Sequence, residues 1–287
     1  MSTYPDDIAM PVGFFPESLE VVGGFAYVAS MTTGDIRKVN LADGTSEVFS
    51  AGNGKRATTG LTVDRQGRMF VCGGPTGVLW VLDEADGSTI ASYQLGGENV
   101  FANDVLITPE AAFVTDSFSP FLYKIPFGPY GKLPSADAVE ALPITGDFVY
   151  QSLDEYGGAF NSNGLVMTPD RSAILVVQTN SGKIFRIDPA SGASVEVRIE
   201  GGDVLWGDGM LLEGHTLHVV QNLANTVSVL DIDAAGRTGR VLDVRTSDTF
   251  DSPTAIARFG SRFFLTNARF GNPDPMNATF NIVAIPA

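Results

Sequence analysis

The 287-residue chain has a single cysteine, Cys72, and only two histidines. One cysteine excludes an internal disulfide, so folding needs no oxidising compartment and a lone buried thiol is expected. No apolar run approaches the length of about 20 residues that a bilayer-spanning helix needs. The first residues also lack the basic and apolar segments of a secretory signal. These absences predict a cytoplasmic protein without a membrane partner.

Basic residues are scarce as well. The chain has 18 Lys and Arg against 33 Asp and Glu, which gives a formal net charge of −15. Such a surface repels phosphate backbones, so nucleic acid is not an expected partner. The acidity is otherwise explained by solubility. A small-molecule substrate remains as the expected partner.

Several catalytic motifs are missing from the chain. It contains no Gly-x-Ser-x-Gly elbow, no phosphate-binding glycine-rich loop and no His-Glu-x-x-His zinc motif. His215 falls in a predicted turn and His218 within a predicted strand, so a histidine proton relay has little support. General base chemistry is therefore expected from a carboxylate.

What the chain does have is a repeat. Six segments each read as a polar residue, a small or polar residue and an aliphatic residue, and each leads into a predicted strand. Their first residues lie 42, 44, 60, 45 and 46 residues apart. The six triplets are Glu17-Ser18-Leu19, Thr59-Gly60-Leu61, Asn103-Asp104-Val105, Asn163-Gly164-Leu165, Asp208-Gly209-Met210 and Thr254-Ala255-Ile256.

Each repeat reads as an antiparallel meander of three or four short strands. Asp64-Arg-Gln-Gly67 and Glu213-Gly214 have the composition of the tight turns between the strands. Six such units without a long amphipathic helix predict an all-β protein, a six-bladed β-propeller of four-stranded blades, rather than a sandwich. We expect one domain over residues 1–287, with a strand near Asp7 to Val12 completing the last blade and closing the ring.

The third repeat carries an insertion around residues 126–160, which contains the aromatics Phe148, Tyr150, Tyr156 and Phe160. Long insertions on short-looped scaffolds are usually functional or disordered. The aromatic content favours a pocket wall or lid. An outer strand with an ordinary surface loop is the alternative.

The first strand of each propeller blade lines the central channel, so the six triplets should converge at one mouth of it. Four of them begin with an oxygen-bearing side chain of the kind that Ca²⁺ prefers, and none begins with His or Cys. The predicted metal ligands are Glu17, Asn103, Asn163 and Asp208. Thr59 and Thr254 replace them in two blades as candidate substrate contacts or supports, and Asn103 is also a candidate substrate contact. Other divalent cations remain possible.

A second ring follows from the same alignment, at the end of each second strand. It comprises Ser30, Gly73, Asp116, Gln178, Gln221 and Asn267. Because antiparallel strands return to the face where the triplets lie, we expect the polar members to contact substrate, although strand ends also become polar on reaching solvent. The candidates for the catalytic base are Asp208, Asp104 and Asp116. Phe15, Phe101 and Trp206, each two residues before a ligand position, would add low-dielectric walls or pack between blades.

The runs Pro16-Glu17-Ser18, Asn103-Asp104, Ser162-Asn163-Gly164-Leu165 and Gly207-Asp208-Gly209-Met210 resemble the senescence-marker-protein/gluconolactonase superfamily of six-bladed propellers. Paraoxonases, diisopropyl-fluorophosphatase and strictosidine-synthase-like proteins belong to the same clan. The resemblance implies that Glu17, Asn163 and Asp208 bind a divalent cation, usually calcium, that Asn103 binds metal or substrate, and that Asp208 doubles as base or nucleophile. It implies a metal-dependent hydrolase of lactones or related esters.

The chain departs from the family pattern in two places. Glu17-Ser18-Leu19 replaces a common Glu-Gly-Pro, and no Arg directly precedes Asn103, which argues against sugar lactones. A calcium-dependent lactonase or esterase is therefore the leading hypothesis. The alternatives are a non-hydrolytic enzyme of specialised metabolism that uses the same pocket for cyclisation, condensation or isomerisation, and a propeller that only binds a small molecule or partner.

Overall fold

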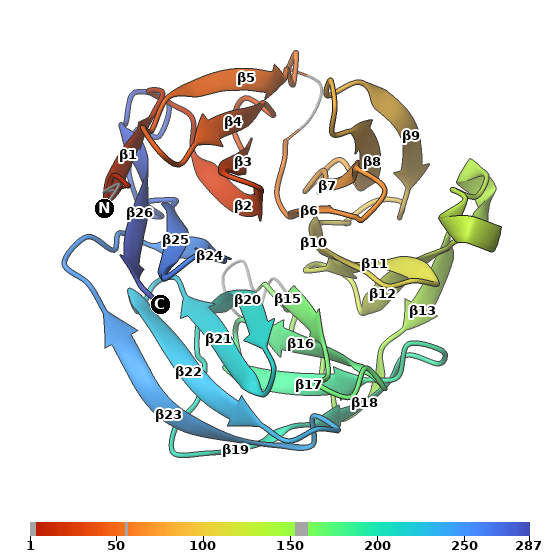
Figure 1. Cartoon of the computed structure of the whole chain (residues 1–287). Helices are drawn as coiled ribbons and strands as arrows, with labels where there is room; N and C mark the ends of the chain where they lie inside the picture. Colours follow the sequence, from red (N-terminus) through yellow and green to blue (C-terminus); the bar gives the residue numbers. More distant parts are fainter. Residues whose placement is uncertain (1–3, 55–56, 153–159) are drawn as a thin grey trace.

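The computed structural model describes residues 4–54, 57–152 and 160–287. Six sheets of four or five strands surround a central axis (Figure 1), and their strands pair antiparallel except at two short outer edges. The helical content of the described residues is two 3₁₀ turns, Pro129–Gly131 and Ala136–Ala138, and no helix there is long and apolar enough to cross a membrane. The predicted all-β, six-bladed propeller is confirmed.

The blades follow one another along the chain, and each begins with its innermost strand. Blade 1 comprises β2 (Pro16–Val22), β3 (Phe25–Ser30), β4 (Ile36–Asn40) and β5 (Ser46–Ser50), and blade 2 comprises β6 (Leu61–Val63), β7 (Arg68–Cys72), β8 (Val78–Asp83) and β9 (Thr89–Gln94). Blade 3 comprises β10 (Ala102–Ile107), β11 (Ala111–Asp116), β12 (Phe121–Pro126) and β13 (Glu140–Pro143). Blade 4 comprises β15 (Ser162–Met167), β16 (Ile174–Gln178), β17 (Lys183–Ile187) and β18 (Ala193–Glu196). Blade 5 comprises β20 (Gly207–Glu213), β21 (Thr216–Gln221), β22 (Thr226–Ile232) and β23 (Thr238–Thr246), and blade 6 comprises β24 (Pro253–Phe259), β25 (Arg262–Asn267) and β26 (Phe280–Pro286).

Blade 6 is completed by the other end of the chain. Strand β1 (Asp7–Met10) pairs antiparallel with β26, with Asp7 opposite Val283 and Met10 opposite Phe280 (Figure 1). Ile8 and Met10 are buried in the core between blades 6 and 1. The predicted N-terminal closure is confirmed, although the strand is shorter than expected.

Deleting residues 1–11 should therefore lower the melting temperature far more than loss of a free terminus would. The deletion removes the buried Ile8 and Met10 side chains, each worth about 1.5–3 kcal/mol, and exposes the edge of β26. Thermal unfolding and size-exclusion chromatography would measure the loss of stability and the expected self-association. An unchanged melting temperature would contradict the role of β1.

Two blades gain a fifth strand at the periphery. Strand β14 (Thr145–Gly146) pairs parallel with β18 of blade 4, and β19 (Arg198–Glu200) pairs parallel with β23 of blade 5. In both cases the chain leaves the outer strand of one blade and joins the edge of the next. These short strands, which were not predicted from the sequence, connect neighbouring blades at the rim.

The triplets of the repeat coincide with β-bulges. In five blades the pairing of the first two strands shifts by one residue across the triplet, as between Pro16 and Leu19 or between Gly207 and Met210. A bulge re-aims a side chain locally without breaking the sheet. It is the local feature that sets the first residue of the triplet apart from the regular strand.

The small middle residue of the triplet is required by packing between blades. A Cβ on Gly164 would lie 2.3 Å from the backbone oxygen of Asp208, and one on Gly209 would lie 2.7 Å from that of Thr254. Gly60 faces the oxygen of Asn103 in the same way, at 2.6 Å. The backbone of the next blade occupies the space of a side chain, so this part of the pattern reports the fold rather than a function.

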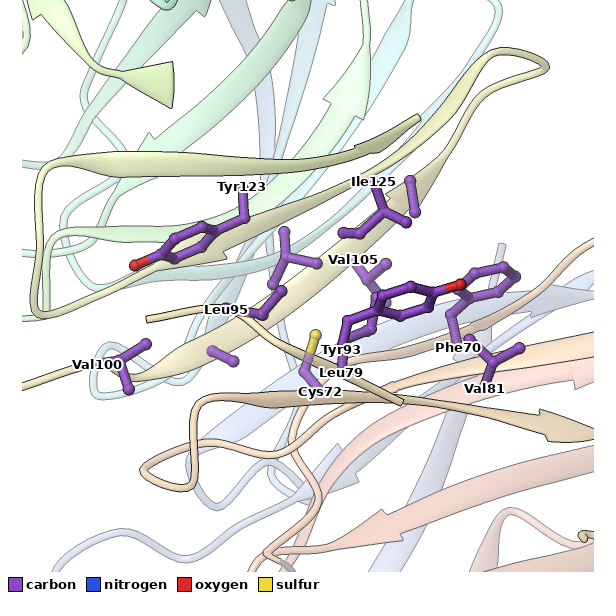
Figure 2. Close-up of a cluster of buried hydrophobic side chains, with 13 residues drawn as sticks. Phe70, Cys72, Leu79, Val81, Tyr93, Leu95, Val100, Val105, Tyr123 and Ile125 are labelled. Atoms are coloured by element: carbon purple, nitrogen blue, oxygen red, sulfur yellow. The ribbon is translucent and has the colours of Figure 1, made fainter. Parts of the chain in front are cut away.

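Hydrophobic clusters fill the spaces between adjacent blades. Figure 2 shows the cluster between blades 2 and 3, where Phe70 and Tyr93 face Val105 and Ile125. Cys72 is part of this cluster and fully buried, as predicted, and burial raises the pKa of its thiol well above the usual value. The thiol is therefore held in its unreactive protonated form.

The insertion around residues 126–160 contains the outer strand β13, flanked by longer connections. Phe127, Leu133 and Val139 pack on the cluster between blades 2 and 3. Farther along, Phe148 packs against Phe185 of blade 4, with ring centroids 4.9 Å apart. Tyr156 lies outside the described residues.

Candidate functional site

The four predicted metal ligands come together at the centre of the ring. Glu17, Asn103, Asn163 and Asp208 are all buried, with 9%, 3%, 5% and 4% of their surface exposed, and all line one central cavity. We call these four residues the carboxylate–amide ring. Their convergence is the arrangement that the repeat spacing predicts.

The cavity has a volume of about 1390 Å³ and is bounded by the first strands of all six blades. We call the face where these strands begin the ring face, and the face where they end, in the turns to the second strands, the turn face. The cavity extends from the carboxylate–amide ring along the strands to the turns. Phe127 and Gly131 of the insertion line it, whereas Phe148, Tyr150 and Phe160, the described aromatics on which the predicted pocket wall rested, do not.

Hydroxyl groups orient the two amides of the ring. Asn103 Nδ2 donates to Ser117 Oγ at 2.8 Å, and Asn163 Nδ2 donates to Thr179 Oγ1 at 3.1 Å. Each hydroxyl in turn donates to a backbone oxygen of the next blade at 2.7 Å. Because the amide nitrogens are occupied, the oxygens remain as the free ligand atoms; no described residue donates a hydrogen bond to either of them.

Asp208 is held by two amides. Its Oδ2 accepts a hydrogen bond from Asn222 Nδ2 at 2.7 Å, and the Asn163 side chain also hydrogen-bonds to it. Ser117, Thr179 and Asn222 occupy equivalent positions, one residue after the predicted second ring. The other three blades have Met31, Gly74 and Ala268 there. This set was not predicted from the sequence, although its polar members fall in the three blades that carry Asn103, Asn163 and Asp208.

Two buried carboxylates, Glu17 and Asp208, and two half-buried ones, Asp104 and Glu20, share the cavity, and all four have raised pKa values. Burial, followed by the charges of Asp208 and Asp104, holds the pKa of Glu17 well above its usual value. Burial likewise raises the pKa of Asp208 to about 7 and that of Asp104 to about 6. Glu20, which the sequence analysis missed, has its pKa raised by burial to about 7, against a hydrogen bond from Thr62 that lowers it. Such a group of acids without a basic partner favours a bound cation.

The donor set fits a calcium ion better than a transition metal. Among the described residues, no three Asp, Glu, His or Cys side chains form a metal-binding group by themselves. The carboxylate–amide ring instead combines two carboxylates with two amide oxygens. Hard oxygen donors of mixed charge are typical ligands of Ca²⁺. The free amide oxygens and the uncompensated carboxylates are the observations that make this set suitable for a cation.

The predicted second ring does not reach the cavity. Asp116 Oδ1 accepts hydrogen bonds from the backbone N–H groups of Phe101 and Phe118, both at 2.9 Å, and Gln221 Nε2 donates to Leu205 O at 2.9 Å. The equivalent polar side chains of Ser30, Gln178 and Asn267 also bond to loop backbone, and Gly73 packs against Trp80. None of the six lines the cavity. Strand ends on the ring face meet the connections between blades rather than the axis, so the structure does not bring Asp116 or the other members to a substrate position.

The two threonines of the repeat link blades. Thr59 Oγ1 donates to Ala102 O at 2.8 Å, and Thr254 Oγ1 donates to Glu17 O at 2.6 Å. Thr254 lines the cavity and Thr59 does not. Both hold the backbone next to a ring residue, and they are placed to position Asn103 and Glu17 rather than to contact substrate directly.

Phe15, Phe101 and Trp206, predicted as walls or as packing between blades, lie on the ring face before the triplets, and none of them lines the cavity. Phe15 and Trp206 adopt left-handed backbone conformations, with φ of 46° and 63°. Such conformations cost roughly 1–3 kcal/mol in a non-glycine residue and often occur at functional sites. Phe101 packs against Phe118 and Phe160, with centroids 5.0 and 5.2 Å apart.

Neither histidine reaches the cavity. His215 Nδ1 bonds to Ile232 O at 2.8 Å, and His218 is 3% exposed and packs against Phe263 with ring centroids 4.7 Å apart. Both lie in blade 5, outside the residues that line the cavity. The interpretation of His218 as a packed strand residue agrees with its position.

No family model and no curated protein matches the sequence. Among solved structures, the Malassezia sympodialis allergen Mala s 1 is similar with a TM-score of 0.71 and 13% identity, covering 98% of this chain and 96% of the other. The calcium-binding protein regucalcin from Agrobacterium tumefaciens matches with a TM-score of 0.66 and 16% identity, over 99% and 95% of the two chains. Virginiamycin B lyase from Staphylococcus aureus, a catalytically inactive histidine variant with quinupristin, matches with a TM-score of 0.63 and 15% identity, over 91% and 81%. The predicted resemblance to the senescence-marker-protein/gluconolactonase superfamily is thus confirmed at the level of the fold.

The raised pKa values predict how the stability of the metal-free protein depends on pH. Above pH 4 the unfolded carboxyls lose their protons, whereas folded Glu20, Asp104 and Asp208 keep theirs up to about pH 6–7. Folding therefore takes up protons in this window, and stability falls as pH rises from 5 to 7 and then levels off. His218, whose pKa burial lowers, acts in the opposite direction below its usual pKa.

Thermal unfolding in the presence of a chelator would measure this slope. We expect a higher melting temperature at pH 5 than at pH 8, and a smaller difference in the Glu20→Gln variant. Adding calcium should raise the melting temperature mainly at pH 8. A melting temperature of the chelated protein that rises between pH 5 and 8 would contradict the repulsion among these acids.

Proposed function

We propose that this protein is a calcium-dependent hydrolase of a lactone or related ester. The observation that carries the proposal is the group of buried and half-buried carboxylates around two oriented amide oxygens, at the inner end of a cavity of about 1390 Å³. The superfamily resemblance and the fold of a calcium-binding relative support the choice of ion and reaction. Fold alone does not determine a reaction, so the residues of the site are the main argument.

Glu17, Asn103, Asn163 and Asp208 would hold the ion. A bound Ca²⁺ supplies a Lewis acid that polarises a carbonyl oxygen. The chain's own contribution is orientation, since Asn222 and the two hydroxyls of Ser117 and Thr179 fix the ring side chains before substrate arrives. Such preorganisation is a large part of electrostatic catalysis.

Asp104 is the best placed general base. It lines the cavity beside the ring without belonging to the predicted ligand set, and one of its oxygens accepts a hydrogen bond from Val105 N at 2.8 Å. Its pKa of about 6 lies near neutral pH, where a general base is most effective. In this proposal the Asp104 carboxylate takes the proton of the attacking water.

The alternatives have weaker support. A histidine substitution accompanies inactivity in the lyase relative, whereas no histidine of the described residues lines the cavity of this chain. A non-hydrolytic reaction would therefore need to use the same carboxylates. A module that only binds a partner would not need four acids in one cavity, two of them buried, because they cost folding free energy in the absence of a cation.

Removal of metal tests the proposal directly. The protein would be treated with a calcium-selective chelator and assayed against a panel of aryl esters and aliphatic and aromatic lactones, with its melting temperature recorded in parallel. We expect hydrolysis and several degrees of thermal stability to be lost together and restored by Ca²⁺. If the chelator changes neither, the metal assignment is wrong. A metal-dependent melting temperature without hydrolysis of any ester or lactone would favour the non-hydrolytic alternative.

A further inference from the structure

The outer edge of blade 5 is partly open. Strand β23 has nine residues, is the longest strand of the described chain, and lies at the rim of the propeller (Figure 1). Strand β19 pairs with residues 238–240, and the chain continues beside Val241, where a Cβ on Gly201 would lie 3.5 Å from Val241 O. Residues 242–246 have no strand on their outer side within the part of the chain that the structure describes. We call residues 242–246 the free edge.

The outer strands of the other blades are shorter or are covered by other segments. Strands β1, β13 and β18 have four residues each, and β5 has five, with Gly87 of blade 2 against its end, where Ser50 Oγ donates to Gly87 O at 3.0 Å. The six-residue β9 has the 3₁₀ turn Ala136–Ala138 beside it, and its Tyr93 Oη donates to Pro134 O at 3.1 Å. Short strands and covered edges are usual ways in which proteins prevent pairing with other chains. In the described structure, the free edge of β23 lacks both protections.

The free edge exposes apolar side chains. Leu242 and Val244 have 59% and 50% of their surface exposed. A β-bulge lies at Leu242, where the pairing with β22 shifts by one residue. Beyond the bulge, residues 243–246 pair in regular register with β22, so their outward backbone groups keep the spacing of a strand. A second strand with apolar side chains is the partner that fits such an edge.

The free edge is complementary to itself in an antiparallel pair. Its sequence is Leu-Asp-Val-Arg-Thr. With Val244 opposite its own copy, Asp243 of each chain lies opposite Arg245 of the other, and opposite charges at such positions stabilise a sheet. Registers centred on Asp243 or Arg245 would place like charges opposite each other, which is destabilising. A register centred on Leu242 would require residues 238–240, which β19 occupies. Charge and space therefore favour the register centred on Val244.

Asp243 and Arg245 are placed for this pairing. They project from the same face of β23, because alternate residues of a strand do so, and their own contact is loose, with Arg245 Nε 3.8 Å from Asp243 Oδ2. Arg245 is held by the ring of Phe263, whose centroid lies 5.6 Å from the guanidinium carbon, and its Nη1 donates to Pro286 O at 3.1 Å. The Asp243 side chain is 63% exposed. One charge is thus positioned by blade 6, and the other can reach a second chain.

We propose that two copies of this chain pair antiparallel through the free edge, with Val244 beside a two-fold axis. The two blade 5 sheets would then form one continuous sheet. Because a two-fold contact uses the same edge on both copies, it closes after two chains and gives a dimer rather than a fibre. A contact of this length is small, so we expect a reversible dimer with a Kd on the order of 10–100 µM. The inference does not depend on the proposed ion or reaction.

Exchanging charges on the free edge tests the pairing. Asp243→Arg leaves only positive charges on the edge and Arg245→Asp only negative ones, so each variant alone should associate at least about tenfold more weakly than the original protein. Mixed in equal amounts, the two variants should form a dimer again, because each positive edge then meets a negative one. Analytical ultracentrifugation from about 1 to 500 µM would measure both effects. Glu98→Arg, which replaces an exposed acid away from the free edge, is the control for net charge and should associate like the original protein.

A cross-link tests the register. Val244→Cys would place a thiol next to its own copy at the two-fold axis, whereas Cys72 is fully buried and should not react. Val48→Cys is the matched control, since Val48 lies in the middle of the outer strand β5 and is 49% exposed, against 50% for Val244. With a short bis-maleimide, Val244→Cys should form a covalent dimer at least about tenfold faster than Val48→Cys.

Pairing of two copies is overturned if the chain stays monomeric up to about 500 µM and Val244→Cys cross-links no faster than Val48→Cys. A dimer that both charge variants leave unchanged would have its interface elsewhere, which also overturns the free edge as the contact. If each variant weakens the dimer but mixing does not restore it, the proposed register is wrong. Restoration on mixing, together with fast cross-linking at Val244, supports the proposal and shows that both charge variants fold.

Discussion

Replacing Asp208 with Asn should lower ester hydrolysis about 10³-fold while making the chelated protein more stable. The substitution keeps the size of the side chain and an oxygen that can accept from Asn222. It removes one of the two carboxylates of the predicted ligand set, and with it a charge that adds to the effect of burial in raising the pKa of Glu17. Loss of a charged group from a catalytic site typically costs 10²–10⁴-fold in rate.

The opposite signs of the two effects make the measurement specific. In the presence of a chelator at pH 8, the Asp208→Asn protein should melt several degrees above the original, because one buried charge and its repulsion are gone. Calcium should stabilise it less than it stabilises the original protein. Asp116→Asn provides a comparison within the chain: Asp116 holds a loop outside the cavity, so its substitution should lower stability with no direct effect on calcium binding. A destabilised Asp208→Asn protein with unchanged calcium response would contradict the site.

Replacing Gly164 with Ala should destabilise the propeller by about 3 kcal/mol, the upper part of the range for overpacking. The added Cβ would lie 2.3 Å from Asp208 O and 3.1 Å from Met210 N, both backbone atoms of blade 5. Relief of the clash requires the two blades to separate. Because Asp208 is the residue displaced, calcium affinity should fall together with the melting temperature, which should drop by roughly 6–9 °C for a domain of this size.

Gly24→Ala is the matched control for that substitution. Gly24 lies in the β2–β3 turn, and a Cβ there would have no atom within 4 Å. Its melting temperature and calcium affinity should stay close to those of the original protein. If Gly164→Ala behaved in the same way, close packing of the first strands would not explain the small residue in the triplet.

The repeat made the fold predictable because its period, turns and strand lengths all agree with one architecture. The same register also identified Glu17, Asn103, Asn163 and Asp208, since equivalent positions of a ring must converge. The register alone could not show, however, which residues on this face point into the cavity and which contact the connections between blades. Asp116 and Gln221 end second strands on the same face, but their side chains meet the connections between blades rather than the axis.

Other features depend on tertiary contacts that a periodic pattern does not contain. Glu20 follows Glu17 on the same strand, on the other side of the β-bulge. Only the packing of β2 beside Thr62 places its side chain in the cavity. The orienting residues Ser117, Thr179 and Asn222 could have been found by extending the alignment one position. The parallel pairs of β14 and β19 involve two and three residues, too few for any pattern of alternation.

The junction between blades 6 and 1 joins residues from opposite ends of the chain. Thr254 Oγ1 donates to Glu17 O across 237 positions of sequence, and β1 pairs with β26 at the same junction. Synthesis proceeds from Glu17 toward Thr254, so the backbone of Glu17 meets this partner only after blades 2 to 5 have been made. The contact that positions the Glu17 backbone in the carboxylate–amide ring therefore forms in a nascent chain only once the strands of blade 6 have been made.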